Sequence, residues 1–464
     1  MEDKKIDLLA NQPVIKAIFA LSIPMIMGMM VQVFYNLADT YFIGLLGDAN
    51  QLAAANMALP VFVILMGLAS MIGTGASSYI SRCLGQKAYE EAHCTTSIAT
   101  ALLGLISIVV MITGLFFAKP LVQALGGSGE TYAYTFQYVV IMLLGGFGVI
   151  GNFAFGQLLR AEGNAMRSMM GMVIGTVLNL ILDPLFIFGF DLGVAGAALA
   201  TVIGNCVGLL YYVICFIKGK TLLKIQWKWV KFDKTIYTEI FKIGVPSSLT
   251  QILMGASTIV VNNIAIAYGT ETVAGLGIAT KIMMIGTFIF IGFSSGCQPL
   301  IGYNYGAHNY ERVKLILKRG TQVTASVGIA LLLLFTISST FLIGMFTKDA
   351  IVIEKGTTIF KALIWSLPFL GAQMIATSAA QSMGKAIPSM ILSISRQGIL
   401  YIPLVLILNA AFSFNGFIYA QPITDLLMCL LAQLYIGWLI AKEVVAKQKE
   451  VVEQKESGLT SEYE

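Results

Sequence analysis

The chain has 464 residues, of which 57% are hydrophobic and only 11% charged, and its mean hydropathy is +0.82. This composition leaves too little polar surface for a water-soluble domain, so most of the chain must face lipid. The formal net charge of +5 reflects basic residues in loops between apolar segments and gives no reason to expect nucleic-acid binding.

Long apolar runs predict an all-α membrane protein with 12 transmembrane helices, because about 20 apolar residues are needed to cross a bilayer. The first six helices are expected near residues 14–46, 52–81, 95–118, 132–158, 168–190 and 194–217. The other six are expected near 236–268, 272–303, 313–346, 351–383, 389–410 and 416–441. Pro24 and Pro246 are candidate kink sites in the first and seventh helices.

The two halves of the chain repeat each other with an offset of about 221 residues. The segment GNAMRSM at 163–169 recurs as GKAIPSM at 384–390, and GQKAYE at 85–90 recurs as GAHNYE at 306–311. Each half holds an even number of predicted spans, so both enter the membrane in the same direction. The halves are therefore expected to form two six-helix lobes related by a pseudo-twofold axis along the membrane normal.

Basic residues concentrate in every second loop, which predicts that both termini are cytoplasmic. We expect an N-lobe at 1–217, a cytoplasmic basic linker at 218–235, a C-lobe at 236–441 and a charged cytoplasmic tail at 442–464. The first span is too long for a cleavable signal, and no small-residue processing site precedes its end. The expected location is the cell membrane of a prokaryote, with the chain crossing it many times.

Basic and aromatic residues alternate in the linker, in the segment KIQWKWVKF at 224–232. This pattern favours a segment that lies on the anionic inner surface of the membrane. A specific site for a lipid or a regulator is the sharper alternative.

Several classes of chemistry are not indicated by the sequence. The six cysteines form no Cys-x-x-Cys pair and are expected to be reduced, while the two histidines, His93 and His308, fall in predicted loops. The glycine pattern of a phosphate-binding loop is incomplete, so ATP hydrolysis is not expected. A membrane-embedded enzyme remains a remote alternative, because no histidine falls within a span to act as acid or base. We therefore predict that the protein is not an enzyme and that it needs no cofactor.

Polar residues inside the spans indicate where the mechanism lies, because an ionisable group at membrane depth is expensive. Counted from Asp48 and Asp191 in the predicted external loops, Asp39 and Asp183 lie about 13 Å and about 12 Å below the outer surface. Thr201 lies at about 15 Å, so all three share one layer of the N-lobe.

Further polar residues fall on the same helical faces, since residues three or four apart are neighbours on a helix. Asn179 precedes Asp183 by four residues, and Tyr35 and Asn36 precede Asp39 by four and three. Carboxylates in a partly dry pocket hold protons more tightly, and their oxygens, with an amide and a hydroxyl, could instead surround a small cation such as Na⁺. The alternatives are that Asp183-Pro184 is a kink and that Asp39 is neutral and merely hydrogen-bonded.

The C-lobe is not an ionic copy of the N-lobe. Val261 corresponds to Asp39, and Pro403 or Leu404 corresponds to Asp183. The C-lobe has intramembrane charges of its own, Asp425, Lys281 and Arg396. We interpret Asp425 with Lys281 or Arg396 as a buried ion pair with a structural role, or alternatively a role in substrate contact or gating.

The 22 methionines and 27 phenylalanines could line a cavity for varied flat or cationic organic molecules, although most must serve ordinary packing. Paired glycines, at 171 and 175 and at 204 and 208, favour close helix contacts. Lipid-linked saccharide flippases are the main alternative within membrane transport, but their anionic substrates call for more basic residues in the membrane interior. A channel or receptor built on the same repeat is a further alternative.

Three segments in order resemble the multidrug and toxic compound extrusion (MATE) transporters: YNLADTYFIG at 35–44, LRAEGN at 159–164 and LNLILDP at 178–184. The resemblance covers the whole chain. It implies that Asp39, Asn179, Asp183 and Thr201 match the N-lobe cation site of the DinF-like branch, and that Pro24 matches the proline at which the first helix bends. The acidic residues that the NorM-like branch carries in its seventh and tenth helices are replaced here by Gln251 or Gly255 and by Gln373.

The sequence therefore predicts an antiporter that exports amphipathic organic cations in exchange for H⁺ or Na⁺ by alternating access. Its expected partners are small organic cations and membrane lipid, with no nucleic acid, and it is expected to be a monomer. Na⁺, if it is the coupling ion, would lie among Asp39, Asn179, Asp183 and Thr201, with Tyr35 and Asn36 close by.

Overall fold

The computed structural model describes residues 2–46 and 48–460, and throughout that part of the chain the regular elements are helices. Residue 1 of the predicted N-lobe and residues 461–464 of the predicted tail lie outside the described residues. The first half contains α1 (Glu2–Ala10), α2 (Val14–Leu45), α3 (Ala49–Gly85), α4 (Tyr89–Phe116), α5 (Ala118–Ala124), α6 (Gly129–Leu144), α7 (Gly146–Ala161), α8 (Ala165–Pro184), the π-helical turn η1 (Leu185–Gly189) and α9 (Gly193–Ile217).

A connection containing the 3₁₀ turn η2 (Trp227–Trp229) leads to the second half. The second half contains α10 (Lys234–Ile266), α11 (Thr270–Gly306), α12 (Tyr310–Gly344), α13 (Ala350–Leu363), the 3₁₀ turn η3 (Ile364–Ser366), α14 (Leu367–Ser382), α15 (Ala386–Ile394), the π-helical turn η4 (Ser395–Ile399) and α16 (Tyr401–Thr460).

The described helices accommodate the twelve predicted membrane crossings. Ten segments are long and apolar enough to cross a membrane, and α6 with α7, bent by 49°, provides an eleventh. One of the ten runs from Ala386 to Ala446 and is divided at Ser413, whose φ of 52° and ψ of −134° interrupt the helix. Because this segment is long enough for two spans, the count reaches twelve, and the all-α prediction is confirmed.

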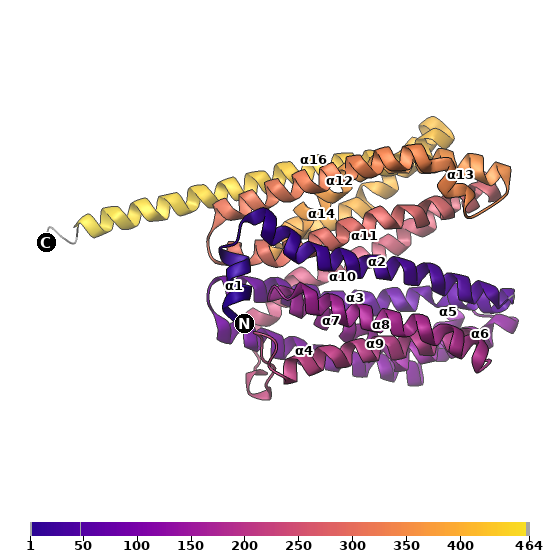
Figure 1. Ribbon diagram of the computed structural model, residues 1–464, viewed down its shortest axis with the longest axis horizontal. Helices are drawn as coiled ribbons and strands as arrows, with labels where there is room; N and C mark the ends of the chain where they lie inside the picture. Colours follow the sequence, from indigo (N-terminus) through magenta and orange to yellow (C-terminus); the bar gives the residue numbers. More distant parts are fainter. Residues whose placement is uncertain (1, 47, 461–464) are drawn as a thin grey trace.

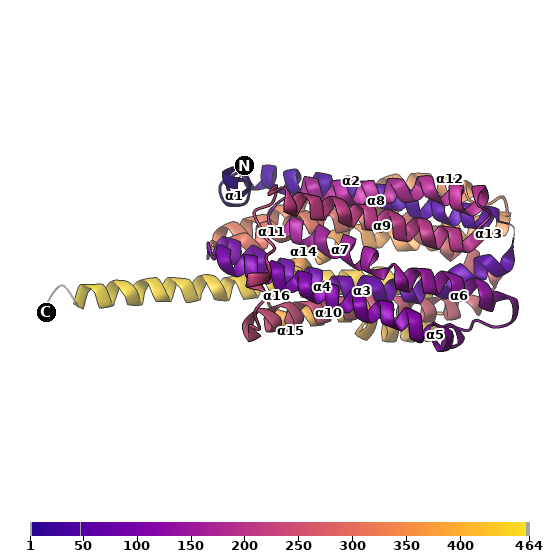
Figure 2. The same ribbon diagram turned by 90° about the horizontal axis from the view of Figure 1, so that it is seen from below.

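The helices form two bundles that lie side by side (Figure 1). Helices α2–α9 make the first bundle and α10–α16 the second, and the two meet where α2 and α3 pack against α11 and α10. The N-terminus, α1 and the free end of α16 all lie at one end of the molecule, which we call the terminal end, while α5 and α13 lie at the other (Figures 1 and 2).

The interface between the bundles is reciprocal, as a pseudo-twofold axis requires. A side chain on Gly85 of α3 would overlap the carbonyl oxygen of Tyr303 in α11, and one on Gly306 of α11 would overlap that of Arg82 in α3. Gly85 and Gly306 are repeat partners, and so are Arg82 and Tyr303. The segments that reveal the repeat in the sequence thus cross each other near the axis, at the terminal end.

Hydrogen bonds reinforce the interface in the half of the membrane region nearer the terminal end. Arg82 forms a 2.7 Å ion pair with Glu239 of α10, and both side chains are largely buried. Ser22 Oγ donates to the carbonyl oxygen of Phe293 at 3.1 Å, and the hydroxyls of Ser70 and Ser247 lie 2.8 Å apart. These contacts close the terminal end.

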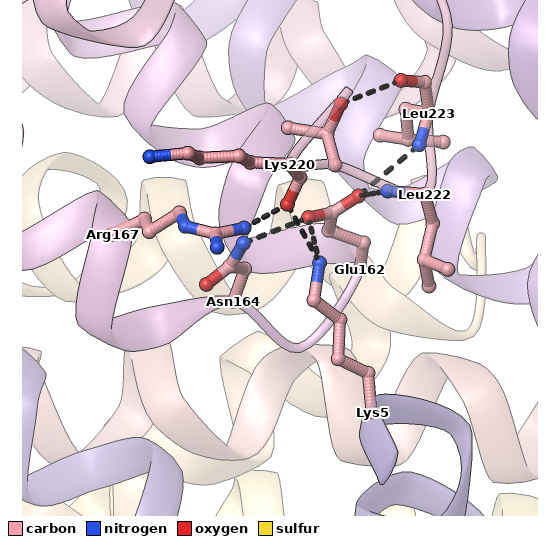
Figure 3. A network of polar contacts seen from close by, with 8 residues as sticks. Lys5, Glu162, Asn164, Arg167, Lys220, Leu222 and Leu223 are labelled. Carbon is pink, nitrogen blue, oxygen red and sulfur yellow. Dashed lines mark hydrogen bonds and ion pairs between the residues drawn. The ribbon is translucent and has the colours of Figure 1, made fainter. Parts of the chain in front are cut away.

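A fully buried carboxylate, that of Glu162 after α7, ties three distant segments together at the terminal end (Figure 3). It accepts hydrogen bonds from Lys5 Nζ of α1 at 2.7 Å and from Asn164 Nδ2 at 3.0 Å. It also accepts the backbone N–H groups of Leu222 and Leu223, at 2.5 Å and 3.2 Å. Glu162 therefore fixes both the N-terminal helix and the start of the connection between the bundles.

Replacing Gly306 with alanine should separate α3 from α11, because the new methyl group would meet backbone atoms that cannot rotate away. Overpacking of this kind costs about 1–3 kcal/mol of unfolding free energy. The measurement is thermal unfolding of the purified protein in detergent. Gly104→Ala is the matched control, since nothing lies within 4 Å of a side chain added there. Equal unfolding temperatures for the two variants would contradict the close crossing.

Glu162→Gln should loosen the connection between the bundles, because one of its two acceptor atoms becomes a donor that faces N–H groups. Hydrogen bonds to a charged group contribute about 1.5–3 kcal/mol. We expect a lower unfolding temperature and faster tryptic cleavage at the lysines between α9 and α10. The exposed Glu90→Gln is the control, and a cleavage rate shared by both variants would refute the anchoring role.

Candidate functional site

One side of the candidate site is formed by α8 and α9, which pack closely against each other. A Cβ atom added to Gly204 of α9 would overlap the carbonyl oxygen of Gly175 in α8 and would lie 2.9 Å from Asn179 Cβ. The glycines at 175 and 204 thus bring the two helix backbones together, as their spacing predicts. Asn179 is held directly against α9, and Asp183 follows one turn later on the same face of α8.

Asp183 is a buried carboxylate that lacks a hydrogen-bond donor. Its side chain is 0% exposed and that of Asn179 is 3% exposed. Both carboxylate oxygens of Asp183, and Oδ1 of Asn179, have no hydrogen-bond partner among the described residues. Buried polar atoms are nearly always paired, so this cluster of three oxygens is an unusual feature and suits an ion or a proton that the protein exchanges.

Helix α2 supplies the other side of the site. Tyr35 Oη lies 3.3 Å from Oγ1 of the buried Thr201 in α9, so one hydroxyl donates to the other. Asp39, one turn after Tyr35, is half-buried, and its charge lies close enough to Asp183 to interact with it. Asn36 lies between Tyr35 and Asp39 in α2, and its side chain also takes part in an interaction. The structure thus brings the predicted residues of α2, α8 and α9 into one region of the first bundle.

Three residues that the sequence did not single out extend this polar region. Tyr138 of α6 lies near enough to Asp39 and Asp183 to interact with both charges. Asn205 Nδ2 donates to the Thr201 carbonyl oxygen at 2.8 Å, and Asn152 Nδ2 of α7 donates to Asn205 Oδ1 at 3.0 Å. Asn205 could have been recognised as an amide four residues after Thr201 in an apolar span, whereas a single tyrosine in α6 carries no such signal.

The donor set of the site consists of oxygen atoms from carboxylate, amide and hydroxyl groups. Hard cations such as Na⁺ and the proton bind such oxygens, whereas zinc and similar metals prefer nitrogen and sulfur. Among the described residues, no group of three or more histidine, cysteine, aspartate or glutamate side chains comes together. The arrangement can therefore take up a proton or bind a small hard cation, and release it again.

Pro24 lies within α2 between two residues that contact the second bundle. Ser22 bonds to α11, and Ile26 lies against Gly292 of α11. The proline is buried inside a helix that continues on both sides of it. Helix α2 is thus held against α11 on both sides of Pro24, while Tyr35 and Asp39 lie more than two turns beyond the proline.

The second bundle carries a different polar centre. The repeat aligns Val261 of α10 with Asp39, and Pro403 or Leu404 of α16 with Asp183, so these positions carry no charge in the second bundle. Arg396 Nε donates to Asp425 Oδ1 at 2.8 Å, so Arg396 is the partner of Asp425. Lys281, predicted as a buried charge, is instead exposed, because it lies on a face of α11 that does not pack into the bundle.

Comparison with known proteins places these features in a family. The MatE family model matches residues 24–185 and 246–407, which is more than half of the chain and follows its internal repeat. The multidrug export protein MepA of Staphylococcus aureus (strain MRSA252) is 36% identical over 457 residues, covering 98% of this chain and all of that protein. MepA of Staphylococcus saprophyticus is 32% identical over 453 residues, with the same coverage.

A solved structure shows the same architecture. The outward-facing conformation of a multidrug resistance MATE family transporter superposes with a TM-score of 0.91 at 28% identity, covering 95% of this chain and 98% of that one. Three observations point to the same family. One family model matches the chain twice, the structure has two similar bundles, and the relatives match along their full length. This chain belongs to the MatE family of multidrug and toxic compound extrusion transporters.

Proposed function

We propose that this protein is a secondary antiporter of the cell membrane that exports amphipathic organic cations in exchange for H⁺ or Na⁺. The observation that carries the proposal is Asp183, a buried carboxylate with both oxygens unpartnered among the described residues, beside the charge of Asp39. A buried carboxylate without a hydrogen-bond donor, beside a second carboxylate, is too costly in a membrane to serve structure alone. An ion or proton that binds there in part of the cycle offsets that cost.

The proposed coupling uses Asp39, Asp183, Asn179 and Thr201, with Tyr35, Asn36 and Tyr138 around them. When the carboxylates hold no ion, their negative charge favours a cationic substrate in the space between the lobes. Binding of H⁺ or Na⁺ neutralises that charge and removes the attraction, so substrate leaves. The substrate and the coupling ion both depend on the negative charge of these carboxylates, so binding of one disfavours binding of the other.

Alternating access requires the two bundles to move as units, and the described contacts favour a state closed at the terminal end. Arg82 with Glu239, and the crossing of Gly85 and Gly306, hold that end together. We place both termini in the cytoplasm from the distribution of basic loops, so the closed end faces the cytoplasm and the site opens outward. Pro24 is the proposed hinge, because a proline inside a helix removes one backbone hydrogen bond and allows the helix to bend there.

The available driving force is adequate for export against a gradient. A one-for-one exchange of H⁺ or Na⁺ for a monovalent organic cation moves no net charge, so the concentration gradient of the ion drives export. A tenfold ion gradient supplies about 1.4 kcal/mol and sustains a tenfold substrate gradient. Relatives named as multidrug export proteins, matched over their full length, support export of organic compounds as the direction of transport.

Asp39→Asn and Asp183→Asn should each abolish gradient-driven export. An amide keeps the shape of the side chain but neither takes up a proton nor attracts a cation, so we expect at least about a tenfold loss of rate. The measurement is ethidium efflux from proteoliposomes with an imposed pH or Na⁺ gradient.

The matched control is Asp191→Asn. Asp191 precedes α9 with a φ of 53°, a conformation that asparagine also tolerates, and no role in the site is proposed for it. Full pumping by both Asp39→Asn and Asp183→Asn would refute the assignment of the coupling site. Loss of pumping in Asp191→Asn as well would show that any change of charge near this end of the bundle is harmful.

Thermal stability should report what binds at Asp183. Asp183→Asn removes a buried charge without a partner, so at neutral pH in choline chloride the variant should be at least as stable as the wild type. If the coupling ion is Na⁺, replacing choline by Na⁺ stabilises the wild type by mass action and leaves Asp183→Asn unchanged. If it is H⁺, the two salts are equivalent for both proteins. Equal stabilisation of both proteins by Na⁺ would place Na⁺ at a different site.

A further inference from the structure

The connection between the bundles carries an exposed basic segment that has no part in the proposed coupling. We call residues 224–232, with the sequence KIQWKWVKF, the anchor segment. It contains three lysines and no acidic residue, and all three lysine side chains are exposed. None of the three forms an ion pair within the described part of the chain. Their charges are therefore available to a partner outside the protein.

The anchor segment is held against the first turns of α4, at the terminal end of the molecule (Figure 1). The Lys224 N–H donates to His93 Nδ1 at 3.2 Å, and the Gln226 N–H donates to Ser97 Oγ at 3.2 Å. The ring of Trp229 stacks on that of His93, with centroids 4.9 Å apart and an angle of 22° between the planes. The segment therefore belongs structurally to the first bundle.

The side of α4 that holds the anchor segment is a side that faces lipid. Ser97, which contacts the segment, is 1% exposed, whereas Gly104, Ile108 and Leu115 further along α4 are exposed. All four residues fall within about 40° of one another around the helix axis. Leu115 lies about 27 Å beyond Ser97 along the helix, close to the thickness of the hydrocarbon layer. The anchor segment therefore lies at the edge of that layer, where the lipid headgroups begin.

Two aromatic side chains of the anchor segment are almost fully exposed. Trp227 is 87% and Phe232 88% exposed, whereas Trp229 between them is half-buried against α4. Lys228 Nζ lies 4.9 Å from the centroid of the Trp229 ring, so a cation–π contact keeps this ammonium group beside the aromatic rings. Tryptophan is enriched at the headgroup level of membranes, where its ring leaves water and its N–H still finds acceptors.

Both ends of the anchor segment are fixed by the protein itself. Just before it, the Glu162 carboxylate accepts the N–H groups of Leu222 and Leu223. Just after it, Asp233 Oδ1 accepts the Thr235 N–H at 2.8 Å and begins α10. A segment that is ordered before it meets its partner loses little conformational entropy on binding.

We propose that the anchor segment docks on anionic phospholipids of the cytoplasmic leaflet and ties the first bundle to that surface. Trp227 and Phe232 insert among the headgroups, and the three lysines bind the headgroup phosphates. Each lysine near an anionic membrane surface strengthens the attraction about fivefold. A second protein or a nucleic acid fits this place less well, because the exposed apolar face of α4 beside the segment requires lipid there.

The test uses the full-length protein in nanodiscs, with Trp227 as its only tryptophan and the other three replaced by phenylalanine. Phenylalanine at position 229 keeps an aromatic ring against His93. Quenching of Trp227 fluorescence is measured in brominated phosphatidylcholine and in a mixture with brominated phosphatidylglycerol of equal bromine content. Quenching should be about twofold stronger in the mixture, and high salt should remove the difference, because salt screens surface charge.

The triple variant Lys224→Gln/Lys228→Gln/Lys231→Gln should lose the preference for phosphatidylglycerol. All three positions are exposed, so the fold should be retained, and thermal unfolding checks that it is. The matched control, Lys314→Gln/Lys318→Gln/Arg319→Gln, removes the same charge from exposed positions of α12 and should keep the preference.

Three outcomes would overturn the proposal. Equal quenching in the two lipid compositions before the lysines are replaced would show that anionic headgroups are not recognised. Equal loss of the preference in both triple variants would show a general attraction of this face of the protein and no anchor. Fluorescence of a water-exposed Trp227 in both compositions would leave the segment to a soluble partner.

Discussion

The structure is organised around a charge that lipid cannot solvate. Asp183 sits on a glycine-lined contact between α8 and α9, fully buried, with no hydrogen-bond donor to its carboxylate among the described residues. A group in that position is stable only when the surrounding helices, water or a bound cation compensate it, so its surroundings must change when its ligand does. Helix α2 links this region to the second bundle, because Tyr35 contacts Thr201 and Ser22 bonds to the Phe293 carbonyl oxygen of α11.

The two bundles have similar helix arrangements, but the polar groups in their interiors differ. The first concentrates carboxylate, amide and hydroxyl oxygens, while the second presents a guanidinium whose charge is balanced by Asp425. One family model matches both halves, and glycine contacts such as those of Gly85 and Gly306 lie where the bundles cross. The side chains of each interior are then free to diverge. In the proposed cycle only the first bundle couples to an ion, so the second bundle needs no copy of the coupling site.

Much of this could be read from the sequence because membrane proteins follow strict rules. Apolar length fixes the spans, and the two GQKAYE-like segments fix the repeat, so the fold follows with little ambiguity. Asp39, Asp183 and Thr201 were found because depth can be counted along a helix. Tyr138 was missed because its contribution depends on how α6 packs beside α2, and no local pattern records that. The partner of Asp425 was left open for the same reason: Lys281 and Arg396 stand at similar depths, and only the rotation of α11 about its axis shows that Lys281 faces outward.

The terminal end explains how the motion can be reversible. The bundles are joined there by backbone contact at Gly85 and Gly306, by an ion pair of modest exposure and by hydroxyl pairs, all of which lose water when they form and regain it when they break. A largely buried ion pair such as Arg82 with Glu239 contributes little net free energy, because the cost of removing its charges from water offsets their attraction. Apolar side chains join the bundles as well, since one buried cluster holds Ile72 and Ile80 of α3 together with Ile240 of α10 and Ile301 of α11. Opening this end would expose part of that cluster, so contacts formed in the open state must offset the cost. In the proposed cycle, ion binding at Asp183 shifts the balance between a state closed at the terminal end and a state open there.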